Sequence, residues 1–255
     1  MKIASTSNLA LNLSRTSAAF VVLALGACGE MPRATAADGL TGTTSSAATA
    51  ASAPSLGAAA GFAVLGASTV TCTGPSAITG DVGVSPGISI TGFNPPCTVT
   101  GAIHAGDAAA VQAHADVGVA YNALAAAACE HNLTGQDLGG QTLAPGVYCF
   151  DSTVGVTGAL TLDAGGDSGG VWIFQVGTAV TTATASSVVM AGGGKAGNVF
   201  WKVGSSATIG TGTAFQGNLV ALASITLTGG SSVVGRALAV NAAVTLDNNK
   251  VSLGN

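Results

Sequence analysis

Two kinds of short apolar segment recur along the second half of the chain. One kind is apolar at nearly every position, and it occupies residues 171–177, 199–204, 219–223 and 237–241. The other kind alternates apolar residues with threonine, and it occupies residues 160–163, 180–182, 207–210, 225–228 and 244–247. Because successive side chains of a strand point to opposite faces, the first kind predicts strands covered on both faces. The second predicts strands with one face in the core and one in water.

These segments return at a nearly constant interval. The step from Gly217 to Gly235 is 18 residues, and the step from Thr226 to Thr245 is 19 residues. An interval of this length suits one coil of a β-helix that contains three short strands, none of which is stable without its neighbours. The pattern therefore predicts a mostly β protein, built as a solenoid with a triangular cross-section.

The alternating segments place threonine on the side away from the core. Apolar residues before and after Thr161, Thr208, Thr226 and Thr245 fall on the opposite side of their strands. Stacked coils would bring these threonines into a row, one step every ~4.8 Å. We therefore expect a solvent-exposed threonine row along one face of the solenoid.

One helix is expected over residues 105–128, which are rich in alanine, the best helix former. Val111, Val119 and Leu124 form a modest apolar stripe, and Asp107 falls in the first turn, where the helix dipole favours a carboxylate. The helix is expected to lie alongside the solenoid and cover the strands that are apolar on both faces. Further strands are expected over residues 62–65 and 76–79, and residues 92–101 are expected to form a loop near one end of the stack.

The N-terminus has the features of an export signal. Lys2 and Arg15 precede the apolar run 18–27, which is shorter than the roughly 20 residues that a membrane-spanning helix needs. The run ends in Leu-Gly-Ala before Cys28, a sequence that resembles a bacterial lipobox, and Gly29 after it favours sorting to an outer membrane. We expect residues 1–27 to be a lipoprotein signal peptide and Cys28 to be lipidated, which makes the protein an outer-membrane or cell-surface lipoprotein. An ordinary signal peptide and a secreted protein is the alternative.

Residues 28–55 are rich in Ala, Ser, Thr and Gly without apolar periodicity, and they are expected to be a flexible linker before a domain at 56–255. The cysteine count agrees with export. Lipidation of one of the five cysteines leaves an even number that can pair in an oxidising compartment. The remaining four are Cys72, Cys97, Cys129 and Cys149. Three connectivities are open, the pairing of nearest neighbours among them, and the missing Cys-x-x-Cys spacing argues against a metal site.

Composition narrows the function classes. Charged residues are 7% of the chain and the net charge is −4, so no basic surface for nucleic acid is expected. Hydrophobic residues make up 48%, which is unlike a disordered chain, and aromatic residues are only 4%, so the apolar content is mostly Ala and Val. The scarcity of charge also argues against the charged cleft of a β-helix carbohydrate-active enzyme.

Few residues suggest chemistry. His104 and Asp107 lie three apart near the expected helix start and form either an acid–base or metal pair or, as we favour, a local hydrogen bond. Three aspartates resemble the paired carboxylates of glycosidases, but we expect them in turns, Asp163 and Asp247 at equivalent positions. They are Asp163, Asp167 and Asp247.

The other familiar patterns are incomplete. Ser168 lacks a Gly-x-Ser-x-Gly context, and residues 192–195 lack Walker spacing. Trp172 and Trp201 are expected in the core, with a sugar-binding platform as the alternative. No catalytic residue, metal site or cofactor is expected.

Several stretches resemble a widespread bacterial and fungal ice-binding domain, first classified as a domain of unknown function. The matching stretches are 62–65, 78–87, 103–109, 139–148, 160–164, 235–239 and 244–248, the fourth of which has the sequence GGQTLAPGVY. They follow one another through nearly the whole of residues 56–251. The resemblance implies a right-handed, discontinuous β-helix with a long helix alongside, and a flat face that binds ice.

Some family members carry a repeated Thr-(Ala/Gly)-x-(Thr/Asn) motif on that face. Here the related turns 182–185, 211–214 and 228–231 keep its first two positions only, whereas 178–181 fits in full. The expected ice-binding residues are Thr161, Thr181, Thr182, Thr208, Thr211, Thr213, Thr226, Thr228 and Thr245. We expect a monomer that adsorbs to ice and slows its growth, or holds a cell against it. A surface adhesin or structural solenoid that binds a protein or polysaccharide is the alternative.

Overall fold

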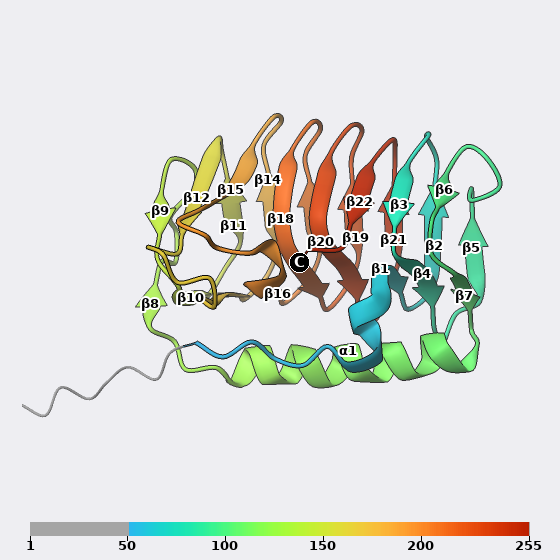
Figure 1. Cartoon of the computed structure of the whole chain (residues 1–255), viewed down its shortest axis with the longest axis horizontal. Coiled ribbons are helices and arrows are strands. Elements are labelled where there is room, and N and C mark those ends of the chain that lie inside the picture. Colours follow the sequence, from blue (N-terminus) through green and yellow to red (C-terminus); the bar gives the residue numbers. More distant parts are fainter. Residues whose placement is uncertain (1–50, 255) are drawn as a thin grey trace, which may run out of the picture. The chain divides into compact units, whose positions relative to one another are not determined.

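The computed structural model describes residues 51–254, so the expected signal peptide, Cys28 and most of the expected linker lie outside the described residues. The described chain forms a solenoid of parallel strands with one long helix along its side (Figure 1). This confirms the mostly β solenoid and its single long helix. None of the helices in this part of the chain is both long and apolar enough to cross a membrane.

Each full coil contributes one strand to each of three faces. The helix face consists of β8 (His131–Asn132), β10 (Gly146–Phe150), β13 (Trp172–Val176), β16 (Val199–Val203), the second halves of β18 (Ala214–Ala221) and β20 (Ser232–Ala239), β1 (Phe62–Gly66), β4 (Asp81–Val84) and β7 (Ile103–Ala105). The face that we call the Thr face consists of β11 (Val154–Val156), β14 (Val180–Thr182), β17 (Ala207–Ile209), β19 (Ile225–Leu227), β21 (Val244–Leu246), β2 (Thr69–Cys72) and β5 (Ser89–Thr91). The third face consists of β9 (Thr142–Leu143), β12 (Ala159–Asp163), β15 (Ser187–Ala191), the first halves of β18 and β20, β22 (Lys250–Ser252), β3 (Ala77–Thr79) and β6 (Thr98–Val99).

The order of coils in the stack differs from their order in the chain. Strand β2, from the start of the domain, pairs with β21 from its end on one side and with β5 on the other. On the helix face, β1 likewise lies between β20 and β4. The β-helix is therefore discontinuous, as the resemblance implied, and β6, which falls within the expected loop 92–101, is an end strand of its sheet.

Two strands turn the corner from the third face to the helix face without a break. Gly217 in β18 and Gly235 in β20 have φ angles of 115° and 145°, which side-chain-bearing residues rarely adopt. A Cβ atom on Gly235 would also collide with the carbonyl oxygen of Gly217. Glycine at this corner lets adjacent coils stack closely while the backbone changes direction.

The interior of the solenoid is filled by alternate side chains of each strand, such as Ala207 and Ile209 of β17. Aromatic residues from successive coils stack on one another, with ring-centroid distances of 5.5 Å between Tyr148 and Phe174 and 3.9 Å between Phe174 and Trp201. Trp172 and Trp201 are fully buried, which confirms the expected core positions. Neither indole ring is available as a sugar-binding platform.

Helix α1 (Ala108–Ala126) begins and ends two or three residues inside the expected range. It covers the helix face, whose outward residues are mostly apolar, and Leu124 is fully buried there as expected. Val111 and Val119, however, are 53% and 68% exposed, so the expected stripe is wrong for both. The buried residues are instead Ala110, Ala113, Val117, Ala120 and Leu124. Three of these five residues are alanines, which let the helix approach the sheet closely.

Both helix ends are hydrogen-bonded. Asp107 is the N-cap residue rather than part of the first turn, and its Oδ1 accepts from the Ala110 N–H at 2.9 Å. At the other end, Gln175 Nε2 donates to the carbonyl oxygens of Leu124 and Ala127, each at 2.7 Å. A helix-face side chain thus satisfies carbonyls that the helix itself leaves unpaired.

The four remaining cysteines form two disulfides, Cys72–Cys97 and Cys129–Cys149. Of the three possible connectivities, the structure has the pairing of nearest neighbours. One bridge closes the end coil that contains β6, and the other joins the segment after α1 to β10.

The N-terminal segment of the described chain lies along α1 (Figure 1). It includes the 3-10 turn η1 (Gly57–Gly61), which is held from both sides. The Ala58 N–H donates to the Asp116 carboxylate of α1 at 2.7 Å, and Arg236 donates to the Ala60 carbonyl through Nε at 3.1 Å and Nη2 at 2.6 Å. Of the expected linker 28–55, only residues 51–55 are described. Ala51 packs against the apolar cluster beneath α1.

Candidate functional site

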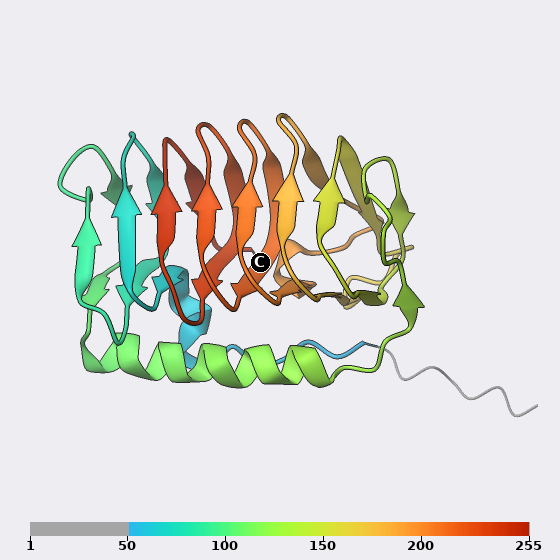
Figure 2. The same ribbon diagram turned by 180° about the vertical axis from the view of Figure 1, so that it is seen from behind.

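The Thr face carries a central rank of threonines in strict register. Figure 2 shows its seven strands side by side above α1. Each outward-facing residue of the rank pairs with the next across the sheet: Gly155, Thr181, Thr208, Thr226, Thr245, Thr71 and Thr91. Six threonines on consecutive strands therefore lie one coil apart, ~4.8 Å from strand to strand. The expected row is confirmed for Thr208, Thr226 and Thr245, and Thr181, which was expected on the same face, lies in register with them.

A first rank lies two residues earlier on each strand. It consists of Thr153, Ala179, Ser206, Ser224, Ala243, Thr69 and Ser89. The hydroxyl oxygens of Ser206 and Ser224 lie 3.1 Å apart across neighbouring coils. Every side chain in this rank is small and uncharged, so the two ranks together form an even surface on which most positions carry a hydroxyl.

Two carboxylates lie at the borders of this surface. At the end of the central rank, Asp137 occupies the space beside Gly155 that a side chain there would need. Burial opposes ionisation of Asp137, but hydrogen bonds from Gly139 and Thr157 outweigh it and lower the pKa of this carboxyl below its ordinary 3.8. Along one side, Asp247 is exposed directly after β21, next to Thr228 and Thr73 of the neighbouring coils.

Two expected ice-binding residues point into the core. Thr182 and Thr213 are 3% and 1% exposed, and their hydroxyl oxygens lie 3.0 Å apart. Thr182 Oγ1 also accepts from the Gly210 N–H at 2.8 Å, and Thr213 Oγ1 donates to the Ala183 carbonyl at 3.0 Å. Their expected place on the surface is wrong, because these hydroxyls hold the buried inner side of a turn.

The other two turn threonines lie at the border of the Thr face. Thr211 is exposed and Thr228 is half-buried, and their hydroxyl oxygens lie 3.3 Å apart. Thr228 Oγ1 also donates to the Ile209 carbonyl at 2.8 Å. The degenerate Thr-(Ala/Gly)-x-(Thr/Asn) turns thus form a corner of the solenoid, with only part of their hydroxyls facing water.

Thr161 lies on a different face from the other threonines. It belongs to β12 and pairs with Thr142 and Val189 on the third face. Its apolar–threonine alternation is the same as that of β19 or β21, so sequence periodicity did not distinguish the two faces. Its expected place in the threonine row is wrong.

Thr71 and Thr91 belong to the central rank but were not expected there. Thr71 pairs with Thr245, and the Thr71 and Thr91 hydroxyl oxygens lie 3.5 Å apart. The signal was present in the Thr-Val-Thr-Cys and Ser-Ile-Thr segments at 69–72 and 89–91, which show the same alternation.

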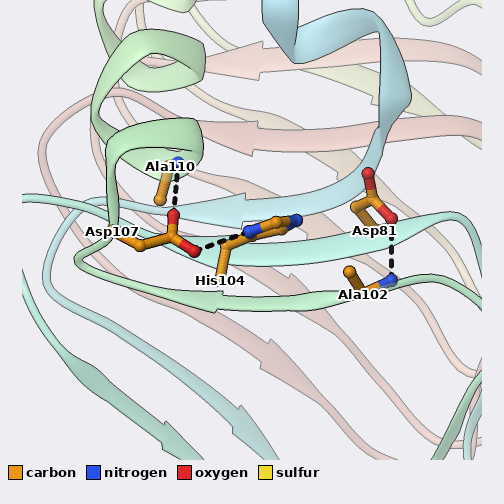
Figure 3. Close-up of polar contacts among 5 residues, drawn as sticks. All are labelled: Asp81, Ala102, His104, Asp107 and Ala110. Carbon is orange, nitrogen blue, oxygen red and sulfur yellow. Dashed lines mark hydrogen bonds and ion pairs between the residues drawn. The ribbon is translucent and has the colours of Figure 1, made fainter.

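The His104–Asp107 pair makes a local contact at the start of α1 (Figure 3). His104 Nδ1 lies 2.8 Å from Asp107 Oδ2, while the other carboxylate oxygen caps the helix. The nearby Asp81 carboxylate accepts from the Ala102 N–H at 2.8 Å and does not join them. These contacts confirm the favoured local hydrogen bond. Within residues 51–254, no three His, Cys, Asp or Glu side chains are grouped as a metal site.

The candidate carboxylates are separated, and those of Asp163 and Asp167 accept hydrogen bonds within turns. Asp163 Oδ1 accepts from the Gly165 N–H, and Asp167 Oδ1 accepts from the Gly169 N–H, both at 2.9 Å. Asp163 is on the third face and Asp247 borders the Thr face, so their expected equivalence is wrong. No pair of these groups flanks a common cleft among the described residues, as glycoside cleavage would require.

Fold and face define the class of protein: a parallel β-solenoid that presents a flat, uncharged, hydroxyl-bearing surface. Within this class the chain belongs to the ice-binding-like family, whose model matches residues 64–252. It is 56% identical over 204 residues to an ice-binding protein of Nostoc, covering 80% of this chain and 75% of that protein.

Two further relatives agree with this assignment. An ice-binding protein of Flavobacterium frigoris is 36% identical over 212 residues, which cover 78% of this chain and 75% of that protein. The crystal structure of an ice-binding protein from the Antarctic ascomycete Antarctomyces psychrotrophicus superposes with a TM-score of 0.78 at 43% identity, covering 80% of this chain and 100% of that one. These relatives are named for ice binding rather than for an enzymatic activity or for adhesion.

Proposed function

We propose that this protein binds ice through the Thr face and thereby slows ice growth and recrystallisation. The observation that carries the proposal is the central rank, six threonines in register on consecutive coils. Ice presents a regular array of water molecules, so a binder needs a regular and rigid array in return. The fixed stacking of coils supplies that regularity.

The side-chain chemistry of the rank suits this task. Threonine offers a hydroxyl that can join a water network and a methyl group that is apolar. Its β-branched side chain has few rotamers, so little conformational entropy is lost on binding. The central rank contains no ionisable side chain, and strongly hydrated ions would oppose the ordered arrangement of water. The proposed action is adsorption without catalysis, by a monomer.

Substitution on two faces tests the proposal. Thr208→Tyr and Thr226→Tyr each place a bulky ring in the middle of the central rank, and we expect loss of ice shaping and of recrystallisation inhibition. Thr161→Tyr is the matched control, because it puts the same ring on an outward strand position of the third face. Activity that survives both Thr-face substitutions but is lost in the control would place the ice contact on the third face.

We further propose that the domain is exported and held at the cell surface by a lipid on Cys28. The lipobox-like sequence before Cys28 supports this proposal. Labelling of intact cells with a radioactive fatty acid should mark the wild-type protein and leave Cys28→Ala unlabelled. Equal recovery of both variants from the culture medium, without label, would contradict the anchor and favour a secreted protein.

A further inference from the structure

Among residues 51–254, Asp247 is the one carboxylate that borders the ranks of the Thr face away from their ends. It follows Leu246, which pairs with Leu227 on one side and with Cys72 on the other. Thr228 and Thr73 follow those two partners, so Asp247 stands between two threonines in a third, outer rank. The rank thus alternates threonine, aspartate and threonine over three consecutive coils.

The carboxylate of Asp247 makes no contact that the fold needs. It is exposed, and within the described part of the chain neither of its oxygens accepts a hydrogen bond. Its oxygens lie over the glycine positions of the neighbouring turns, 2.7 Å and 3.5 Å from where a Cβ on Gly74 or Gly229 would stand. The turn itself is held by Asn249, whose Oδ1 accepts from the Asp247 N–H at 2.6 Å.

Unlike the Asp247 carboxylate, the side chains of the flanking threonines are hydrogen-bonded to a neighbouring coil. Thr228 Oγ1 donates to the Ile209 carbonyl at 2.8 Å, and Thr73 Oγ1 donates to the Leu246 carbonyl at 3.3 Å. Their hydroxyls are oriented by the coil next to them, as a binding array requires. The outer rank therefore has preset hydroxyls on both sides of a free negative charge.

We propose that Asp247 sets the lateral limit of the ice-contacting surface and keeps the outer rank out of it. This inference rests on the proposed function of the Thr face. A carboxylate brought against ice must give up part of its hydration without gaining a partner, and such desolvation is costly. The ice front therefore stops at the central rank beside Asp247, and Thr228 and Thr73 stay in liquid water.

The test is a gain of activity. Asp247→Asn keeps the size of the side chain and removes the charge, and Asp247→Ser provides a second variant if the first folds poorly. Thermal hysteresis and recrystallisation inhibition, measured over a range of protein concentrations, should shift to lower concentration in both variants. Asp163→Asn is the matched control, since it removes one negative charge on the third face while an asparagine oxygen can still accept from Gly165.

Three results overturn the inference. They are an unchanged dose curve in natively folded Asp247→Asn, a loss of activity in it, and an equal gain in Asp163→Asn, which would indicate a general effect of net charge. The double variant Asp247→Asn/Thr226→Tyr separates the inference from the proposed function. If Thr226→Tyr abolishes activity while Asp247→Asn changes nothing, the Thr face binds ice but Asp247 does not limit the contact surface. If Thr226→Tyr stays fully active in both backgrounds, the proposed face itself is wrong.

Discussion

Thr245 and Thr71 are register partners on neighbouring strands, although one lies near the end of the chain and the other near the start of the domain. The central rank is therefore not a product of consecutive repeats alone. It is completed when the N-terminal strands β1 and β2 insert against β20 and β21. Two of its six threonines come from this inserted coil and the one beyond it.

The first prediction concerns those two threonines. Thr71→Tyr is expected to lower thermal hysteresis strongly, because it interrupts the rank next to Thr245. Thr91→Tyr is expected to have a smaller effect, because Thr91 lies at the end of the rank. The matched control is Thr98→Tyr, on the third face of the same end coil as Thr91. Equal activity of Thr71→Tyr and the control would show that the array ends at Thr245.

The second prediction contrasts two adjacent residues of β14. Thr181 faces water and Thr182 faces the core. Thr182→Val leaves the Gly210 N–H without its acceptor and is expected to lower the free energy of unfolding by about 1–3 kcal/mol, with ice activity per folded molecule retained. Thr181→Val is expected to change stability by less than about 0.5 kcal/mol and to weaken ice binding. Urea unfolding and ice shaping on the same samples check both, and a reversed pattern would contradict the assigned orientations.

The third prediction concerns the hold on η1. Arg236→Leu removes the donors to the Ala60 carbonyl and to Asn218 Oδ1, which Nη1 reaches at 2.8 Å. The buried Asn218 Oδ1 and the Ala60 carbonyl both lose their donors, and the unpaired buried oxygen costs about 1–3 kcal/mol. Lower unfolding free energy and faster amide exchange at residues 58–61 are expected. Lys250→Leu, which removes an exposed cation, should leave both quantities unchanged; faster exchange there too would indicate a general loss of stability instead.

The fourth prediction is a pH dependence at the start of α1. The Ala110 N–H, together with His104, holds the pKa of the Asp107 carboxyl below its ordinary 3.8. A pKa that is lower in the folded state means that ionised Asp107 stabilises the fold above pH 3.8 and that this contribution disappears as the pH falls through the lowered value.

Thermal unfolding of wild type and Asp107→Asn, measured from about pH 6 to about pH 2, covers both sides of the ordinary carboxyl pKa of 3.8. The difference in melting temperature should be largest at the upper end and shrink toward the lower end. Asp163→Asn, far from α1 in the chain, corrects for the loss of one charge. A difference that grows as the pH falls would contradict the assigned cause.

Periodicity alone predicted the coil, the outward direction of three central threonines (Thr208, Thr226 and Thr245) and the doubly covered strands. These features follow from the alternation of apolar and polar side chains and from runs of apolar residues, both of which are visible in the sequence. The nearest-neighbour disulfides were among the pairings that the sequence left open. The sequence did not show which face of the solenoid a strand belongs to, because Thr161 on the third face has the same local pattern as Thr226 on the Thr face.

Turn residues were the least predictable. Thr211 and Thr213 lie two apart in one turn, yet the first is exposed and the second is buried. Backbone direction changes within a corner, so the period-two rule that holds along a strand fails there. The helix stripe was wrong for another reason: the prediction relied on Val111 and Val119, whereas the face that packs on the sheet carries Val117, Leu124 and three alanines.

Helix α1 leaves the stack at β7, at one end, and rejoins it at β8, at the other. The length of α1 must therefore match the height of the stack, and with it the number of coils. Each additional coil lengthens the stack by about 4.8 Å, which corresponds to roughly three helical residues at 1.5 Å each. A longer array cannot evolve by duplication of a coil alone; relatives with more coils should carry a helix extended in proportion.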